Sequence, residues 1–298
     1  MESTKNLNEY LLTRLIKISG YSAIVFVLMI FYFLLREGLP TLGEVSFLKL
    51  ISIRWYPIEN YFGLLPLIGG SLIVTLGAAI FAIPIGICTA VFIAEVAPRW
   101  TRDILKPLVE VLGGIPSVVL GFLGILILAP ALRRLLDLPT GLTALAGSIL
   151  LGGVAIPTIV SVAEDALDSV PRSYRDAALA LGATQWQTIW RVTLPAARSG
   201  VMTAIMLGIG RAIGETMAVM MVTGNAAVLP VKWNSIFLPA RTMTATIAAE
   251  MGEVAKNSTH YHVLFFIGLV LFLISLGINI AASTAVFKQR KRAERILS

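Results

Sequence analysis

The stretch LLPLIGGSLIVTLGAAIFAIPIGICTAVFIAE, Leu64 to Glu95, carries no charged residue before its last position. A helix rises about 1.5 Å per residue, so roughly 20 apolar residues cross a hydrocarbon core about 30 Å thick. This stretch is longer than that, and Pro66 and Pro84 favour a tilt or a kink within it. It predicts a helix that spans a membrane.

Five further apolar runs accompany this stretch. They are Ile16 to Leu35, Val109 to Leu132, Leu142 to Val162, Gly200 to Thr223 and Val263 to Phe287. With 57% apolar and 14% charged residues, the 298-residue chain has more apolar surface than one soluble core would hide. The first run is longer than the hydrophobic part of a signal peptide and is expected to be retained. The expected fold class is therefore an all-α integral membrane protein with six transmembrane helices.

Lys and Arg residues are unevenly divided between the two sides that these spans define. The richer side holds Lys5, Arg14, Lys17, Arg99, Arg102, Lys106, Arg172, Arg175, Arg191, Arg198, Lys288, Arg290, Lys291, Arg292 and Arg295. The poorer side holds Arg36, Lys49, Arg54, Arg133, Arg134, Lys232, Arg241 and Lys256. Because positive residues gather on the cytoplasmic side, the N- and C-termini are both expected to be cytoplasmic. The net charge of +7 is then a feature of topology, and no nucleic-acid partner is expected.

This topology predicts the organisation of the chain. Residues 1–62 hold the first span and an external segment, and residues 63–287 form the core transmembrane domain with a cytoplasmic loop at 164–198. Residues 288–298 form a basic cytoplasmic tail. A second external stretch places Met243, Ile247 and Met251 four residues apart, which predicts a short external helix over Arg241 to Glu253.

The longest cytoplasmic connection reads EDALDSVPRSYRDAALALGATQWQTIWRVTLPAARSG, Glu164 to Gly200. Pro171 can open a helix, Gly182 can interrupt it, and Pro195 can lie in the first turn of the next, so two short helices with a bend are expected. Small alanines in the first helix and the pair Trp186 and Trp190 suit a surface that meets a partner. An amphipathic helix lying on the membrane accounts for the pattern equally well.

The spacing within this loop resembles the E-A-A-x3-G-x9-I-x-L-P motif of bacterial ABC importer permeases. Asp176, Ala177, Ala178, Gly182, Val192, Leu194 and Pro195 keep the register of that motif, with Asp for Glu and Val for Ile. The resemblance implies a type I ABC importer permease fold in which this loop is the coupling helix that seats in a groove of the ATPase. It implies an ATPase-coupling role for Tyr174, Arg175, Asp176, Ala177, Ala178 and Gly182.

A phosphate-binding loop of the form G-x-x-x-x-G-K-[ST] is missing, because no Gly is followed by Lys. If ATP powers transport, separate ATPase chains bind it, and this chain is expected to hold no cofactor. His260 and His262 lack the H-E-x-x-H arrangement of a metalloprotease, so no catalytic residue and no metal ligand is assigned. They are expected to be interfacial residues beside Tyr261.

Two charged residues lie inside the fifth apolar run. Arg211 and Glu215 are four apart and are expected to face the same side of one helix. A charge in the centre of a bilayer costs about 2.5 to 3.5 kcal/mol, so both should face protein or a wet path. Two accounts remain open. The residues form a structural ion pair, or Arg211 is a fixed positive site for an oxyanion, with Glu215 orienting it and Thr216 adding a hydroxyl.

Glycines near two of the spans predict local bends. Gly208, Gly210 and Gly214 surround the fifth-span charges and would permit close helix approach or local unwinding. Residues 113–117, GGIPS, would permit a bend early in the third span, although packing is the more ordinary explanation for them. Neither paired broken helices nor internal repeats, which are expected of a secondary transporter, are evident in the sequence.

Three stretches resemble the PstC-type permeases of the phosphate-specific transport system. They are GRAIGETMAV at 210–219, GGIPSVVLGFLGILILAP from Gly113 to Pro130 and ARTMTATIAAEMGE from Ala240 to Glu253. The resemblance covers the chain from about Phe62 onward. It implies phosphate as substrate, an extracytoplasmic phosphate-binding protein as donor, a second (PstA-like) permease subunit, two ATPase subunits and a place in the prokaryotic cell membrane.

Two other functions remain open. Another oxyanion, such as sulfate, molybdate or a phosphonate, is the nearest alternative, because one arginine does not distinguish tetrahedral anions. The second is a membrane scaffold that transports nothing and in which Arg211 and Glu215 only hold the assembly together.

Overall fold

The computed structural model describes the backbone of residues 2–297 and the side chains of residues 10, 12–232, 234–281, 283 and 284. Among these residues the regular secondary structure is helical apart from one short antiparallel strand pair, β1 (Trp55–Tyr56) with β2 (Tyr61–Phe62), and loops join the helices. The all-α prediction is confirmed. The tail 288–298 was predicted as a separate basic segment, but its backbone continues α15 as far as Leu297, and its side chains lie outside the described residues.

Long helices form the body of the molecule. They are α1 (Glu2–Gly38), α4 (Leu65–Val91), α5 (Arg99–Gly114), α8 (Ala144–Asp168), α12 (Arg198–Gly214) and α15 (Thr259–Leu297). In the described chain, five stretches are long and apolar enough to cross a membrane: Leu12–Glu44, Leu65–Val96, Ser117–Leu135, Ala144–Asp168 and Thr259–Ala281. A sixth is reached if Gln185–Ala196 and Arg198–Gly214, bent by 73°, count as one span. Five to six spans therefore agree with the six expected.

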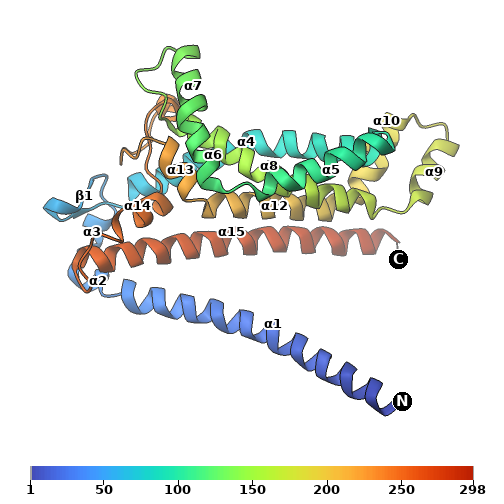
Figure 1. Cartoon of the computed structure of the whole chain (residues 1–298), viewed down its shortest axis with the longest axis horizontal. Coiled ribbons are helices and arrows are strands. Elements are labelled where there is room, and N and C mark those ends of the chain that lie inside the picture. Colours follow the sequence, from blue (N-terminus) through green and yellow to red (C-terminus); the bar gives the residue numbers. More distant parts are fainter. Residues whose placement is uncertain (1, 298) are drawn as a thin grey trace.

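The long helices run roughly parallel, with α15 beside α12 and α1 diverging from α15 toward the N-terminus (Figure 1). Both termini lie at the end of the molecule that carries α9 (Arg172–Ala180) and α10 (Gln185–Thr188) (Figure 1). The opposite end carries the strand pair, α2 (Thr41–Glu44), α3 (Phe47–Leu50) and α14 (Met243–Glu250). The termini and the predicted coupling loop thus share one end; that this end is cytoplasmic stays a prediction.

Glycines allow the central helices to pack closely. Ile159 of α8 is fully buried between Gly86 of α4 and Gly208 of α12. A Cβ atom added at Gly208 would lie 2.4 Å from Ile159 Cγ1, and one at Gly86 would lie 2.7 Å from Ile159 Cγ2. Backbones approach closely where side chains are small, which is how helices associate in lipid. Close approach at Gly208, as the sequence predicted, is confirmed.

The third predicted span is not one helix. Its expected start, Val109, lies in α5, which ends at Gly114; Ile115 is extended, and a new helical run begins with α6 (Ser117–Leu123). That run continues through a π-helical segment (Gly124–Leu128) into α7 (Ala129–Leu135). The residue before a proline avoids helical dihedral angles, so Pro116 forces the break. The start at Val109 was wrong, and the bend over residues 113–117 is confirmed.

The fifth predicted span is also broken. Glu215 has extended backbone (ψ 131°) after the last residue of α12, and α13 (Met217–Val222) begins two residues later. Gly214 is a poor helix former, and the Glu215 carboxylate accepts hydrogen bonds from the backbone N–H groups of Thr216 (3.1 Å) and Ala218 (3.3 Å). The local unwinding expected near Gly214 is confirmed, whereas the continuous helix over Gly200 to Thr223 was wrong.

The predicted helix in the second external stretch is α14, and the first half of this helix is buried. Its first four residues, from Met243 to Thr246, are buried. The Met243 N–H donates to Ser71 Oγ of α4 (2.9 Å), and Thr244 Oγ1 donates to the backbone oxygen of Glu215 (3.1 Å). This stretch therefore packs against α4 and against the break that ends α12.

Candidate functional site

The predicted coupling loop forms two short helices with a bend. Pro171 precedes α9, and Gly182 adopts φ +84°, a conformation that only glycine adopts without strain. A capping box between Thr184 and Gln187 then opens α10. A π-helical segment (Ile189–Thr193) follows, and Pro195 lies in the first turn of α11 (Leu194–Ala196), as predicted.

The residues predicted to couple to an ATPase divide into two groups. Tyr174, Asp176, Ala177 and Gly182 are exposed, as are Trp186 and Trp190, whose rings meet edge to face at 5.7 Å. Ala178 is only 9% exposed and packs within the chain. The expectation that the small alanines form a surface that meets a partner is therefore wrong for Ala178, because its own chain covers it.

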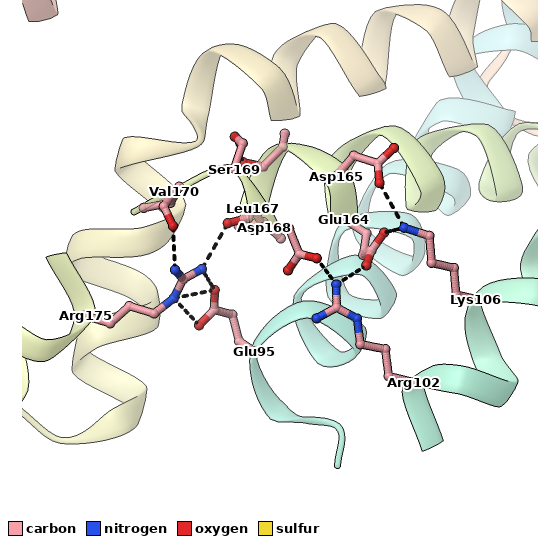
Figure 2. A network of polar contacts seen from close by, with 11 residues as sticks. Glu95, Arg102, Lys106, Glu164, Asp165, Leu167, Asp168, Ser169, Val170 and Arg175 are labelled. Carbon is pink, nitrogen blue, oxygen red and sulfur yellow. Dashed lines mark hydrogen bonds and ion pairs between the residues drawn. The ribbon is translucent and has the colours of Figure 1, made fainter. Parts of the chain in front are cut away.

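Arg175 belongs with the inward group. Its guanidinium lies between the end of the second span and the end of α8 (Figure 2). Nη2 lies 2.5 Å from Glu95 Oε1, and Nε lies 3.1 Å from each Glu95 carboxylate oxygen. Nη1 donates to the backbone oxygen of Val170 (2.7 Å) and Nη2 to that of Leu167 (3.0 Å). Arg175 thus joins α9 to two membrane helices instead of lining the outer surface of the loop.

A second ionic network joins α5 to the same end of α8 (Figure 2). Glu164, only 1% exposed, accepts hydrogen bonds from Arg102 Nη2 (2.6 Å) and Lys106 Nζ (2.7 Å). Asp168 also pairs with Arg102, and Asp165 lies 2.9 Å from Lys106 Nζ. The hydrogen bonds that Lys106 donates to Glu164 and Asp165 raise its pKa above the ordinary value, and burial opposes them. The pairs fix α5 along α8.

Sequence reasoning missed these networks. Arg102 and Lys106 were used only to assign topology, Glu95 was taken as the end of an apolar run, and Glu164 was taken as the start of the cytoplasmic loop. The available signal was the acidic group Glu164, Asp165 and Asp168 on the side predicted to be basic. A cavity of about 550 Å³ lies between the two networks, lined in part by Glu95, Arg102, Asp168, Arg175 and Asp176.

Arg211 does not pair with Glu215. Its Nη1 donates to Thr158 Oγ1 of α8 (3.0 Å), and its Nη2 donates to the backbone oxygen of Gly113 (2.9 Å). Among the described residues no carboxylate pairs with it, and it is exposed in the isolated chain. The prediction that Arg211 and Glu215 share a helix face was wrong, because α12 ends at Gly214 and the Glu215 carboxylate turns to cap α13.

The two broken spans meet at Arg211. Gly113 lies in the last turn of α5, where the third span breaks, and Arg211 lies in the last turn of α12, where the fifth span breaks. Thr216, the third residue proposed from sequence, lies in the second break and donates its hydroxyl to the backbone oxygen of Gly214 (3.3 Å). The structure therefore brings Arg211 to both breaks while separating it from the carboxylate expected beside it.

A separate cluster lies at the opposite end of the molecule. Glu250 of α14 accepts a hydrogen bond from Trp55 Nε1 (3.1 Å), lies 2.7 Å from Arg241 Nη2, and pairs with His260 Nε2 (2.8 Å). Burial raises the pKa of Glu250, but the hydrogen bonds from His260 and Trp55 and the charge of Arg241 outweigh it and hold the pKa below its ordinary value. The histidines thus pair with carboxylates, His262 with Glu44, and in the described part of the chain no three His, Cys, Asp or Glu side chains form a metal site.

Comparisons with known proteins agree with this geometry. The family model described as the binding-protein-dependent transport system inner membrane component matches residues 82–293. A probable ABC transporter permease of Bacillus subtilis, YqgH, is 44% identical over 76% of this chain and 73% of its own length. The phosphate transport system permease PstC of Xylella fastidiosa is 33% identical over 86% and 83%, and PstC 1 of Mycobacterium tuberculosis is 34% identical over 80% and 76%.

Solved structures share the fold. The MetNI methionine ABC transporter in an inward-facing conformation aligns with a TM-score of 0.59 at 21% identity, over 79% of this chain and 99% of that one. A bacterial ABC transporter that imports alginate aligns with a TM-score of 0.57 at 16% identity, over 92% and 99%. The predicted type I ABC importer permease fold is confirmed. Permeases of this kind work with other permease, ATPase and substrate-binding subunits and are not themselves enzymes. This chain belongs to the inner-membrane component family of binding-protein-dependent transport systems, as a multi-pass permease of the cytoplasmic membrane.

Proposed function

We propose that this chain is the permease subunit of an ATP-driven importer of inorganic phosphate. The observation that carries the proposal is Arg211, an exposed cation held by two neutral oxygens where two broken spans meet. Relatives named as phosphate transport permeases, 33% and 34% identical over most of the chain, support phosphate as the anion.

The surroundings of Arg211 suit a site that binds an anion in passing. Thr158 and Gly113 orient the guanidinium without neutralising it, because a hydroxyl and a backbone carbonyl carry no net charge. A guanidinium has five N–H donors in a planar fork that matches the oxygens of phosphate. A transport site must also release its ligand, and a single cation holds an anion less tightly than a closed cage would.

Glu215 has a different role from the one its spacing indicated. Its carboxylate caps α13, and Thr244 holds its backbone oxygen, so it fixes the break near Arg211 without neutralising the arginine. Thr216, in the same break, is the remaining candidate for a contact with the anion. Substrate-path roles for Arg211, Glu215 and Thr216 are therefore proposed in this revised form.

The exposed surface of α9 and α10 is proposed to dock an ATPase. Tyr174, Asp176, Ala177 and Gly182 are exposed there together with the two tryptophans, and the end of the molecule that carries them would face the cytoplasm with both termini. The complete transporter would contain a PstA-like second permease, two ATPase subunits that bind the ATP, and an extracytoplasmic phosphate-binding protein. This chain would bind no cofactor.

The test is uptake into vesicles that contain this chain with its partner permease, the ATPase and the binding protein. We expect ATP-dependent uptake of labelled phosphate, which excess unlabelled phosphate abolishes and equal excesses of sulfate, molybdate or phosphonate leave nearly unchanged. Uptake that one of those anions suppresses instead would assign the transporter to that oxyanion. An assembled, ATP-hydrolysing complex that moves none of them would support the scaffold alternative.

A further inference from the structure

Arg175 lies on the helix proposed to dock the ATPase, yet its guanidinium bonds inward to the end of the second span and to the C-terminal end of α8. We propose that Arg175 is a positioning residue that transmits the movement of α9 to the membrane helices α4 and α8. This inference rests on the proposed function, because it needs an ATPase that moves α9.

The first link runs from α9 to the end of the second span. Both carboxylate oxygens of Glu95 face the Arg175 guanidinium, at 2.5 to 3.1 Å. The Arg175 side chain is 19% exposed and that of Glu95 is 7% exposed, so little water screens the pair. Glu95 lies in the π-helical segment Phe92–Val96 that ends the span, and Gln185 of α10 donates to its backbone oxygen (3.3 Å). Both short helices therefore hold the same residue.

The second link runs from α9 to the end of α8. The last carbonyl groups of a helix lack partners within it, and basic side chains often supply them. Arg175 donates to the carbonyl oxygen of Leu167, in the last turn of α8, and to that of Val170, just beyond the end of this helix. Because the planar guanidinium binds Glu95 and these carbonyls together, α9 cannot shift without moving α4 and α8 or breaking several hydrogen bonds.

The two helices that Arg175 links, α4 and α8, are also in contact with the proposed anion site through α8. Both α4 and α12 pack on α8 through Gly86 and Gly208, which flank Ile159. Thr158, the neighbour of Ile159 on α8, accepts the hydrogen bond from Arg211. A displacement at the α9 end of α8 is thus carried by a closely packed helix to the residue that orients Arg211.

Docking and transmission are then served by different faces of α9. Tyr174 and Asp176, the sequence neighbours of Arg175, are exposed, whereas Arg175 turns inward. Separate faces predict separable defects. A change at Tyr174 should weaken ATPase binding, and a change at Arg175 should leave binding intact but reduce the transport obtained from each ATP.

The experiment compares Arg175→Gln, Tyr174→Ala and a control, Arg191→Gln, which removes an exposed arginine from the same loop. Each variant is assembled with the full transporter in vesicles, and ATPase co-purification, ATP hydrolysis and phosphate uptake are measured. For Arg175→Gln we expect normal co-purification, continued hydrolysis and a loss of uptake per ATP of roughly tenfold, within the range of known coupling free energies. Arg175→Lys, which can reach Glu95 or the carbonyls but not both, should restore part of it.

A second readout needs no transported substrate. Cys88, the single cysteine of the chain, is first replaced by Ser so that a fluorescent label reacts at Gly210→Cys in this chain. The label then reports how accessible the Arg211 region is to a water-soluble quencher. A Cβ at Gly210 meets no atom of this chain within 4 Å, so there is room for the cysteine that carries the label. ATP should change the quenching in the otherwise unaltered transporter and not in Arg175→Gln.

Each outcome decides one question. Unchanged uptake per ATP and unchanged ATP-dependent quenching in Arg175→Gln would overturn the transmission role, as would a loss of ATPase co-purification equal to that of Tyr174→Ala. The unaltered transporter could instead move no phosphate while its ATP-dependent quenching is lost in Arg175→Gln. That result would support the transmission role of Arg175 and contradict the proposal that phosphate is the transported anion.

Discussion

Basic side chains at the coupling end of α8 and at the proposed anion site have opposite kinds of partner. At the end of α8 near α9, Arg102, Lys106 and Arg175 each pair with at least one carboxylate. Where the broken spans meet, Arg211 has only a hydroxyl and a carbonyl as partners among the described residues. Cations with counter-ions hold helices together, whereas the charge of a cation with neutral partners is not neutralised and can attract a mobile anion. The difference separates structural arginines from the one proposed to contact the substrate.

The largest effect on stability is expected when both cations that pair with Glu164 are removed. In Arg102→Met with Lys106→Met, Glu164 would remain 1% exposed without a cation. An unpaired buried charge costs about 3 to 5 kcal/mol, so the melting temperature of the purified chain should fall sharply. Adding Glu164→Met should recover most of the loss, because an apolar triad replaces the ionic one.

The matched control removes two other arginines. Arg133→Met with Arg134→Met alters exposed side chains on α7 and should leave the melting temperature nearly unchanged. Equal melting temperatures for the two double variants would show that the ionic network does not stabilise α5 against α8.

Neighbouring alanines on α9 sharpen the comparison of inward and outward residues. Leucine at Ala178, which is 9% exposed, should overpack the chain and cost about 1 to 3 kcal/mol of folding free energy. Leucine at the exposed Ala177 should change stability by no more than about 0.5 kcal/mol but weaken ATPase co-purification. Thermal unfolding and pull-down of the ATPase measure the two effects, and the reverse pattern would mean that Ala178 faces the partner.

A third group of paired charges extends the comparison to the far end of the molecule. The pKa of Glu250 is held below its usual 4.5, so its ionised form stabilises the fold. That stability is fully present above pH 4.5 and is lost as the pH falls below it through the folded-state pKa. Melting temperatures recorded from about pH 7 to about pH 3 should show a gap between the unaltered chain and Glu250→Gln that narrows only below about pH 4.5. A gap that is independent of pH would contradict this role of the Glu250 carboxylate.

Local patterns in the sequence were sufficient for the helical fold and the coupling loop. Apolar length predicted the spans, and Pro171, Gly182 and Pro195 predicted the two short helices, because each acts on its own backbone. The partners of Arg175 and Arg211 were not predictable in this way. Glu95 and Gly113 lie 80 and 98 residues from them in the chain, so only tertiary packing brings them together.

The error over Glu215 has a local physical cause. A spacing of four places two residues on one face only if the helix continues, and here it ends at Gly214. The glycine did indicate unwinding, but the decisive feature is that the Glu215 carboxylate satisfies the N–H groups of Thr216 and Ala218. Such capping competes with helix continuation, and its outcome depends on the surrounding packing.

The most direct test of Arg211 as the anion-binding residue is the variant Arg211→Gln. Phosphate uptake is measured with the complete transporter in vesicles, and the melting temperature is measured with the purified chain. We predict that phosphate uptake falls by about tenfold or more, since hydrogen bonds to a charged group are worth about 1.5 to 3 kcal/mol. The melting temperature should stay close to that of the unaltered chain, because Arg211 is exposed and has only neutral partners among the described residues. Unimpaired uptake, or a loss of stability like that of the Arg102 and Lys106 double variant, would make Arg211 structural and contradict the account.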